Sequence, residues 1–153
     1  MTSNATNRLN ELGIELPQVV KPLGDYVPAK ASGSQIVTSG QLPIADGVLM
    51  EGRLGAGVDV EQGAKAARAA AINALAAAAD VAGGVDNIAS VDKVVVFVNS
   101  APDFTSQADV ANGASELLGA IFGESGRHAR SAVGVAVLPK NAAVEVELTV
   151  TVA

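Results

Sequence analysis

The side chains best suited to chemistry lie close to the end of the chain, at Arg130, Glu145 and Glu147. A guanidinium can hold a carboxylate or a phosphate through two parallel hydrogen bonds, so Arg130 is a candidate anchor for a small anion. Glu145 and Glu147 alternate along a predicted strand and therefore point to one face, where paired carboxylates can act as general acid and base. The simpler alternatives are a surface ion pair for Arg130 and two solvated carboxylates.

These residues lie in two β-branched, apolar runs, 129–138 and 142–150, which flank turn residues at 139–141. The pattern predicts a β-hairpin. In such a hairpin Glu145 lies about five residues along the strand from the position opposite Arg130, or roughly 16 Å at about 3.3 Å per residue. The two side chains therefore share a pocket only if the strands bend sharply or a neighbouring subunit supplies one of them.

Two helices are predicted upstream of these strands. The first begins after a capping box at Asp59 and continues to Ala82 through a segment rich in alanine, the strongest helix former. The second begins near Ser106, with an acidic residue at the capping distance, and stops at Gly123. Each helix carries one apolar stripe, so each is expected to pack on a sheet.

Further strands are expected at 26–28, 34–42 and 47–50, with a tight turn at Asp46-Gly47. The run Val91–Val98 is apolar throughout and predicts a strand that is buried on both faces. The order of elements predicts an α+β fold with a mixed sheet and both helices on one face. The other face is too apolar to remain in water, which predicts an oligomer.

At 153 residues the chain has the length of one domain, and we expect 1–153 to form a single unit with a polar leader at 1–23. Apolar residues make up 49% of the sequence and charged residues only 17%, which is typical of a packed globule. The leader lacks the features of a signal peptide, and no apolar run reaches the roughly 18 residues of a membrane helix. We therefore expect a cytoplasmic protein without a membrane partner.

Cysteine usage and net charge exclude further classes. The chain has no cysteine and a single histidine, His128, so we expect no disulfide, no thiolate nucleophile and no metal site. A lone histidine at a junction between loop and strand is usually solvated. The net charge is −6 and the ten Lys and Arg residues are scattered, whereas nucleic-acid binders cluster basic residues against phosphates. We therefore expect no nucleic-acid partner and no ribonuclease activity.

Two blocks of sequence carry a family resemblance. The C-terminal block contains Ala-Arg-Ser-Ala-Val (129–133), Leu-Pro-Lys-Asn-Ala (138–142) and Val-Glu-Val-Glu (144–147). The N-terminal block contains Gly-Asp-Tyr-Val-Pro (24–28) and Thr-Ser-Gly-Gln-Leu-Pro (38–43). From about Leu12 to the end, the chain resembles the RidA/YjgF family of reactive-intermediate (enamine/imine) deaminases. The resemblance implies a chorismate-mutase-like fold and a homotrimer, in which the sheets form a central barrel and a ligand cleft lies at each subunit boundary.

The resemblance also implies roles for particular residues. Arg130 occupies the position that binds the substrate carboxylate, and Glu145 matches the glutamate that helps to hold the water attacking the imine. Gly40 matches a pocket-wall glycine whose backbone bonds the ligand, with Ser39 beside it. Glu147 matches a position without a site role.

Three further residues are matched to the ligand site. Tyr26 matches a tyrosine that closes the cleft, and Ala132 is expected to orient the reacting groups through its backbone. Asn112, which is followed by a second poor helix former, Gly113, matches an asparagine that reaches the adjacent subunit's site. The family often has a cysteine at Ala132 and an acidic residue at Gly134. These differences, and a longer loop before the Ala-Arg-Ser motif, indicate a divergent subgroup.

The function that the resemblance implies is the hydrolysis of small 2-imino or enamine acids to 2-keto acids and ammonium, without a metal or an organic cofactor. A non-catalytic binder of small carboxylates is the alternative from another class, because both functions need Arg130. The native substrate cannot be deduced from the sequence.

Overall fold

The computed structural model describes residues 4–19, 22 and 24–153. The described helices are α1 (Ala5–Glu11), α2 (Val60–Ala82) and α3 (Gln107–Phe122). The described strands are β1 (Ala29–Ser32), β2 (Gln35–Thr38), β3 (Ile44–Ala45), β4 (Val48–Leu49), β5 (Arg53–Leu54), β6 (Gly57–Val58), β7 (Ile88–Asn99), β8 (Ala129–Val135) and β9 (Val144–Val152). Short 3₁₀ segments lie at Val85–Asn87, Gly123–Gly126 and Pro139–Asn141.

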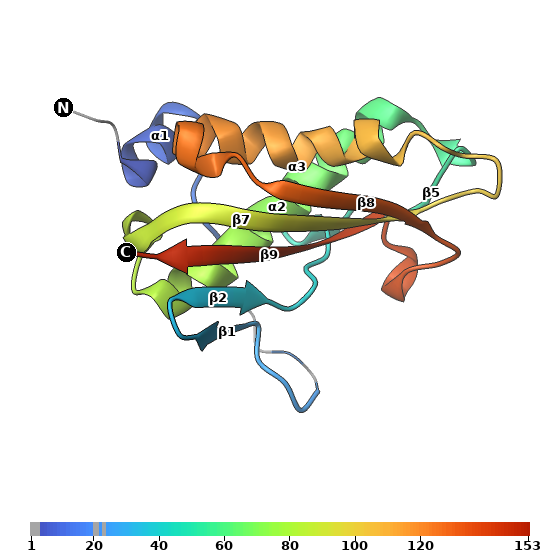
Figure 1. The fold of residues 1–153 in the computed structure, drawn as a ribbon. Helices are drawn as coiled ribbons and strands as arrows, with labels where there is room; N and C mark the ends of the chain where they lie inside the picture. The colour runs from blue at the N-terminus through green and yellow to red at the C-terminus, as the bar shows by residue number, and fades with distance from the viewer. Residues whose placement is uncertain (1–3, 20–21, 23) are drawn as a thin grey trace.

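The main sheet has five strands in the order β1-β2-β9-β7-β8. Strand β8 runs parallel to β7, whereas the other neighbouring pairs in this sheet are antiparallel. Helices α2 and α3 lie side by side on one face of the sheet (Figure 1). Helix α2 packs mainly on β9 and β2, and α3 packs on β7 and β8. The predicted α+β fold, with a mixed sheet and two helices on one face, is therefore confirmed.

The predicted hairpin at the end of the chain is wrong, because β7 lies between β8 and β9. Strand β8 returns from α3 and pairs in parallel with β7, and the chain then crosses the end of β7 to form β9 on its other side. Asn99, fully buried at that end, donates hydrogen bonds to Ala142 O (3.0 Å) and to Asn141 Oδ1 (3.2 Å). The residues that resembled a hairpin turn are thus bound to the end of β7.

Both main helices lie where their sequence signals place them. Asp59 accepts a hydrogen bond from the backbone of Gln62 and closes a reciprocal capping box at the start of α2, and Gly83 ends the helix with a left-handed backbone, φ 81°. Ser106 stands at the start of α3, but its side chain makes no capping bond. The positions of the caps were therefore predictable from local sequence, whereas the lack of a capping bond from the Ser106 side chain was not.

The two helices approach each other closely at Gly113 in α3. A Cβ atom built on Gly113 would lie 1.9 Å from the carbonyl oxygen of Ala64 in α2. The alanine-rich inner surface of α2 is buried against the sheet, which leaves α3 to pack beside it at close range. A poor helix former in the interior of α3 is therefore explained by packing, because only glycine fits against the backbone of α2.

The two faces of the sheet differ in what covers them. On β9, Val144, Val146 and Leu148 are at most 1% exposed beneath the helices, while Glu145 and Glu147 point to the opposite face. No element of the described residues covers that opposite face, which we call the open face. Its residues include Val37 and Val133, which are 45% and 44% exposed. The open face thus presents exposed apolar side chains beside two carboxylates, and a partner would bury the apolar ones.

Strand β7 is buried on one face only, so the expectation of burial on both faces is wrong for the single chain. Val94, Val96 and Val98 are 0% exposed under the helices, whereas Val95 and Phe97 are half-buried on the open face. The apolar run therefore indicates that the open face of β7 becomes fully buried only if another layer of protein packs on it.

The N-terminal strands were only partly predicted. Residues 26–28 form no strand, and the first strand begins at Ala29. Asp46 and Gly47 make the predicted turn with φ values of 52° and 77°, and it connects β3 with β4 in a separate two-stranded sheet. Among the described residues, no helix is both long enough and apolar enough to cross a membrane.

Candidate functional site

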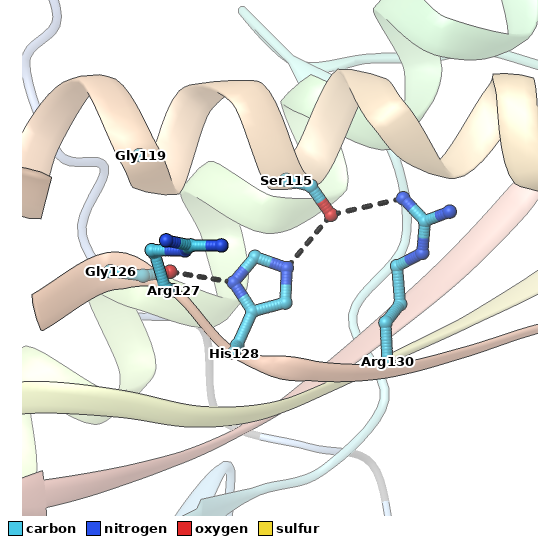
Figure 2. A pocket seen from close by; sticks show the side chains of 6 residues that line it. All are labelled: Ser115, Gly119, Gly126, Arg127, His128 and Arg130. Carbon is cyan, nitrogen blue, oxygen red and sulfur yellow. Dashed lines mark hydrogen bonds between the residues drawn. The ribbon is translucent and has the colours of Figure 1, made fainter. Parts of the chain in front are cut away.

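Arg130 lies on β8 and is held by α3. It pairs with the buried Val94 of β7, so its side chain points to the face that the helices cover. Its Nη1 atom donates hydrogen bonds to Asn112 Oδ1 at 2.8 Å and to Ser115 Oγ at 3.2 Å. Figure 2 shows the guanidinium extending from β8 toward Ser115 on the helix. Asn112 is thus placed beside Arg130 of its own chain.

The partners of Arg130 are neutral, although the simplest expectation was a surface ion pair. The one ion pair among the described residues joins Arg127 to Glu124 and does not involve Arg130. Its nitrogen and oxygen atoms are 3.6 Å apart, and both side chains are exposed. Both hydrogens of Nη1 on Arg130 are engaged by Asn112 and Ser115. Within the described part of the chain its Nε and Nη2 make no hydrogen bond. These two atoms form one edge of the fork, which matches a carboxylate.

A cavity of about 300 Å³ lies beside this group, lined by Ser115, Gly119, Gly126, Arg127, His128 and Arg130. His128 is half-buried and bonded at both ring nitrogens, with Nε2 2.8 Å from Ser115 Oγ and Nδ1 2.7 Å from Gly126 O. The expectation of a solvated histidine is therefore wrong. The guanidinium of Arg130 makes the cavity cationic, because that of Arg127 is already paired with Glu124, and a cationic cavity suits an anionic ligand.

Glu145 lies on the open face beside Gly40. A Cβ atom built on Gly40 would approach the carboxyl carbon of Glu145 to 2.7 Å, so the absence of a side chain there leaves room for the carboxylate. Neither the N–H nor the C=O of Gly40 has a hydrogen-bond partner among the described residues. Burial, and secondly the negative charge of Glu147, raise the pKa of the Glu145 carboxyl above its usual value of 4.5. A raised pKa suits a group that must take up a proton near neutral pH.

The raised pKa of Glu145 predicts a pH-dependent gain in stability for Glu145→Gln. The folded state favours the protonated carboxyl, so the stability that this group contributes is present at low pH and is lost as pH rises through the raised folded pKa. We expect Glu145→Gln to melt at a higher temperature than the wild type at about pH 8, with the difference shrinking toward about pH 4. Thermal unfolding at several pH values measures this. A glutamine variant that is less stable at pH 8 would instead indicate that Glu145 has a cationic partner.

Ser39 precedes Gly40 and contacts the loop that contains Tyr26. Ser39 Oγ donates a hydrogen bond to Val27 O at 2.6 Å and so fixes the loop that precedes β1. Tyr26 belongs to that loop, outside any strand, and is 60% exposed. Ser39, Gly40 and Glu145 are therefore neighbours, and Tyr26 lies on the loop that Ser39 holds.

The candidate residues thus form two groups that a single chain does not bring together. Arg130 is aligned with Val94 on the helix face, and Glu145 is aligned with Phe97 on the open face, with β7 between them. Ala132 follows Arg130 on the helix face and packs partly against the core. The prediction that pairing of the strands cannot unite Arg130 with Glu145 therefore holds, although the predicted register was wrong.

Sequence reasoning missed Ser115 and undervalued His128, yet both left a periodic signal. Asn112 and Ser115 are three residues apart on a helix and so share a face. His128 and Arg130 are two residues apart at the start of a strand and so point the same way. A larger cavity of about 360 Å³ lies on the outer side of the helices and contains none of the predicted site residues. Among the described residues no group of three His, Asp or Glu could hold a metal ion.

Comparison with known proteins adds a family and several relatives. Residues 6–152 match the family described as "YjgF/chorismate mutase-like, putative endoribonuclease". "Protein TCP17" of Trypanosoma cruzi is 50% identical over 144 residues, which cover 93% of this chain and 90% of that protein.

Two crystal structures are similar along most of the chain. One is of "a putative endoribonuclease" from Shewanella oneidensis, with a TM-score of 0.94, 36% identity, and coverage of 98% of this chain and 100% of that chain. The other is of E. coli TdcF with bound serine, with a TM-score of 0.64, 25% identity, and coverage of 89% and 94%. The larger score belongs to a structure whose stated activity differs from the one that the sequence motifs imply.

Proposed function

The chain belongs to the YjgF/chorismate-mutase-like family, and from this premise we propose that it is a hydrolytic deaminase of small 2-imino or enamine acids. The observation that carries the proposal is the state of Arg130. Its guanidinium is half-buried, held by two neutral acceptors and in contact with no carboxylate among the described residues. Such a group has an unmet preference for an anion, and its Nε–Nη2 edge matches the shape of a carboxylate.

We propose that the active site lies between two copies of the chain, in a homotrimer whose sheets form a central barrel with their open faces in contact. One copy supplies Arg130 with Asn112 and the backbone at Ala132, and its neighbour supplies Glu145 with Gly40, Ser39 and Tyr26. Two observations support this arrangement: the separation of the two groups by β7 and the exposed apolar side chains of the open face. Burial of the open face accounts for both stability and site assembly.

The chemistry needs one water and no other reactant. Arg130 holds the carboxylate and fixes C2 of the iminium acid, while Glu145 takes a proton from the water whose oxygen bonds to C2. The resulting carbinolamine receives that proton on nitrogen, the C–N bond breaks, and the hydroxyl proton leaves with the ammonia as ammonium. The product is a 2-keto acid. The N–H of Gly40, which has no hydrogen-bond partner within the described part of the chain, can donate to the substrate or to the developing alcohol.

Bound serine in the TdcF structure is consistent with a small carboxylate ligand, and it equally fits a binder without turnover. A ribonuclease, which the family description and the Shewanella structure suggest, is disfavoured by the net charge of −6 and the scattered basic residues. Salt-sensitive RNA cleavage that persists through repurification and is lost in an Arg130 variant would favour that activity instead.

The test is ammonium release from 2-iminopropionate generated in situ, with 2-ketobutyrate binding measured in parallel by calorimetry. We expect faster ammonium release than in buffer, together with binding that depends on Arg130. Binding of 2-ketobutyrate without faster ammonium release would indicate a carboxylate-binding protein and not a deaminase. An assembled protein with neither activity would contradict both functions. Light scattering on the same sample measures the number of subunits, which we expect to be three.

A further inference from the structure

Hydrogen bonds lead from Arg130 through two residues that the reaction itself does not use. Arg130 Nη1 donates to Ser115 Oγ, which lies 2.8 Å from Nε2 of His128, and Nδ1 of His128 lies 2.7 Å from Gly126 O (Figure 2). Because a carbonyl oxygen only accepts, Nδ1 carries the proton, and Nε2 of the neutral ring is then an acceptor. With a neutral imidazole, the Ser115 hydroxyl therefore donates to His128 and accepts from Arg130.

We propose that Ser115 and His128 are positioning residues, which hold the guanidinium of Arg130 in the orientation that binds the substrate carboxylate. This inference rests on the proposed function. His128 takes the only proton of the Ser115 hydroxyl and so turns a lone pair of Oγ toward Arg130. With Asn112 on the other hydrogen of Nη1, the plane of the fork is fixed before the ligand arrives. A group ordered in advance loses less conformational freedom on binding.

The arrangement of the backbone supports a dedicated role over chance contact. Ser115 is half-buried in the interior of α3, where a serine hydroxyl commonly bonds a carbonyl of its own helix. Its bonds here go to His128 and Arg130, on a different segment. His128 is in turn bonded to Gly126, a buried glycine whose added Cβ would lie 2.5 Å from Leu118 O. The segment that precedes His128 therefore packs directly against the helix that carries Ser115.

Ser115 and His128 also have the spacing of a nucleophile and its base, and the geometry argues against that use. A nucleophilic oxygen needs a free lone pair directed at the substrate. Arg130 donates to this oxygen, which withdraws electron density from it and weakens attack. The pair is therefore better suited to holding Arg130 than to forming a covalent intermediate.

The first test compares Ser115→Ala with Ser115→Thr in the full chain. Alanine removes the hydroxyl and threonine retains it, so we expect about 3- to 10-fold weaker binding of 2-ketobutyrate for Ser115→Ala and near-normal binding for Ser115→Thr. His128→Asn keeps a donor for Gly126 O and removes the acceptor for Ser115, and it should weaken binding in the same direction. The melting temperatures of the variants should stay close to that of the wild type. Wild-type affinity in Ser115→Ala would overturn the proposal.

A second measurement does not depend on ligand. Nitrogen-15 NMR of the unliganded protein should show His128 protonated on Nδ1 alone, and slow rotation of the Arg130 Nη groups, assigned with Arg130→Lys. Ser115→Ala should accelerate that rotation and Ser115→Thr should not. If the wild type binds no 2-ketobutyrate, the proposed function fails, while this spectrum still decides whether Ser115 orders Arg130. An unchanged Arg130 signal in Ser115→Ala would overturn the inference even in an active enzyme.

Discussion

Arg130→Lys is expected to weaken 2-ketobutyrate binding and imine turnover by at least about tenfold, or roughly 1.4 kcal/mol, in a protein that still folds and assembles. Lysine keeps the charge but has neither the second donor edge for a carboxylate nor the planar group that Asn112 and Ser115 hold. Arg130→Ala removes the charge as well and should cost about 2–5 kcal/mol of binding free energy, because the ligand carboxylate is left unpaired.

The matched control for this arginine is Arg68→Lys. Arg68 is exposed on α2 and lines the cavity on the outer side of the helices, not the one beside Arg130, so its replacement should leave binding and turnover unchanged. Calorimetry and the ammonium assay measure both variants, with light scattering and thermal unfolding to establish assembly. Full activity in an assembled Arg130→Lys protein would remove Arg130 from the site.

Gly113→Ala is expected to destabilise the fold by about 3 kcal/mol or more, with a fall in melting temperature of roughly 10 °C. The new Cβ would lie 1.9 Å from the carbonyl oxygen of Ala64, and a backbone atom cannot turn aside as a flexible side chain can. The helices must separate, which disturbs the packing of both on the sheet. Denaturant and thermal unfolding measure the loss.

Gly119→Ala is the matched control, because Gly119 lies in the same helix and an added Cβ there meets no heavy atom within 4 Å. Alanine is the better helix former, so this variant should gain about 0.5–1 kcal/mol. Opposite signs for the two substitutions would locate the effect in packing rather than in helix propensity. A stable Gly113→Ala protein would show that α2 and α3 lie further apart than described.

Local signals in the sequence predicted the helices well because the groups that start and end a helix are close in sequence. Asp59, Gln62 and Gly83 fix α2 through bonds made within a few residues. The family motifs likewise singled out Arg130 and Asn112, which the structure joins by a hydrogen bond of 2.8 Å. The α+β order of elements followed from the alternation of helical and strand periodicity.

The pairing of β8 with β7 could not be predicted in the same way, because the pattern of two apolar runs with turn residues between them also fits a hairpin. Strand β7 lies between β8 and β9 and pairs with one of them along each edge, and Asn99 holds the crossing chain at its end. Which strands pair with each other depends on contacts between residues that are distant in sequence. The periodic signals of α3 and β8 likewise do not show that these two elements lie together, so the hydrogen bond between Ser115 and His128 was not predicted.

The most direct test of a site shared between two copies mixes two inactive variants. Arg130→Ala lacks the anchor and Glu145→Gln lacks the base, so each assembly alone should release little ammonium from 2-iminopropionate. If the two are unfolded together and refolded in equal amounts, about a quarter of the interfaces should combine an intact Arg130 with an intact Glu145 from the neighbouring copy. We therefore predict about a quarter of wild-type activity in the mixture. No activity in a mixture shown by native mass spectrometry to contain both variants in one assembly would contradict the shared site.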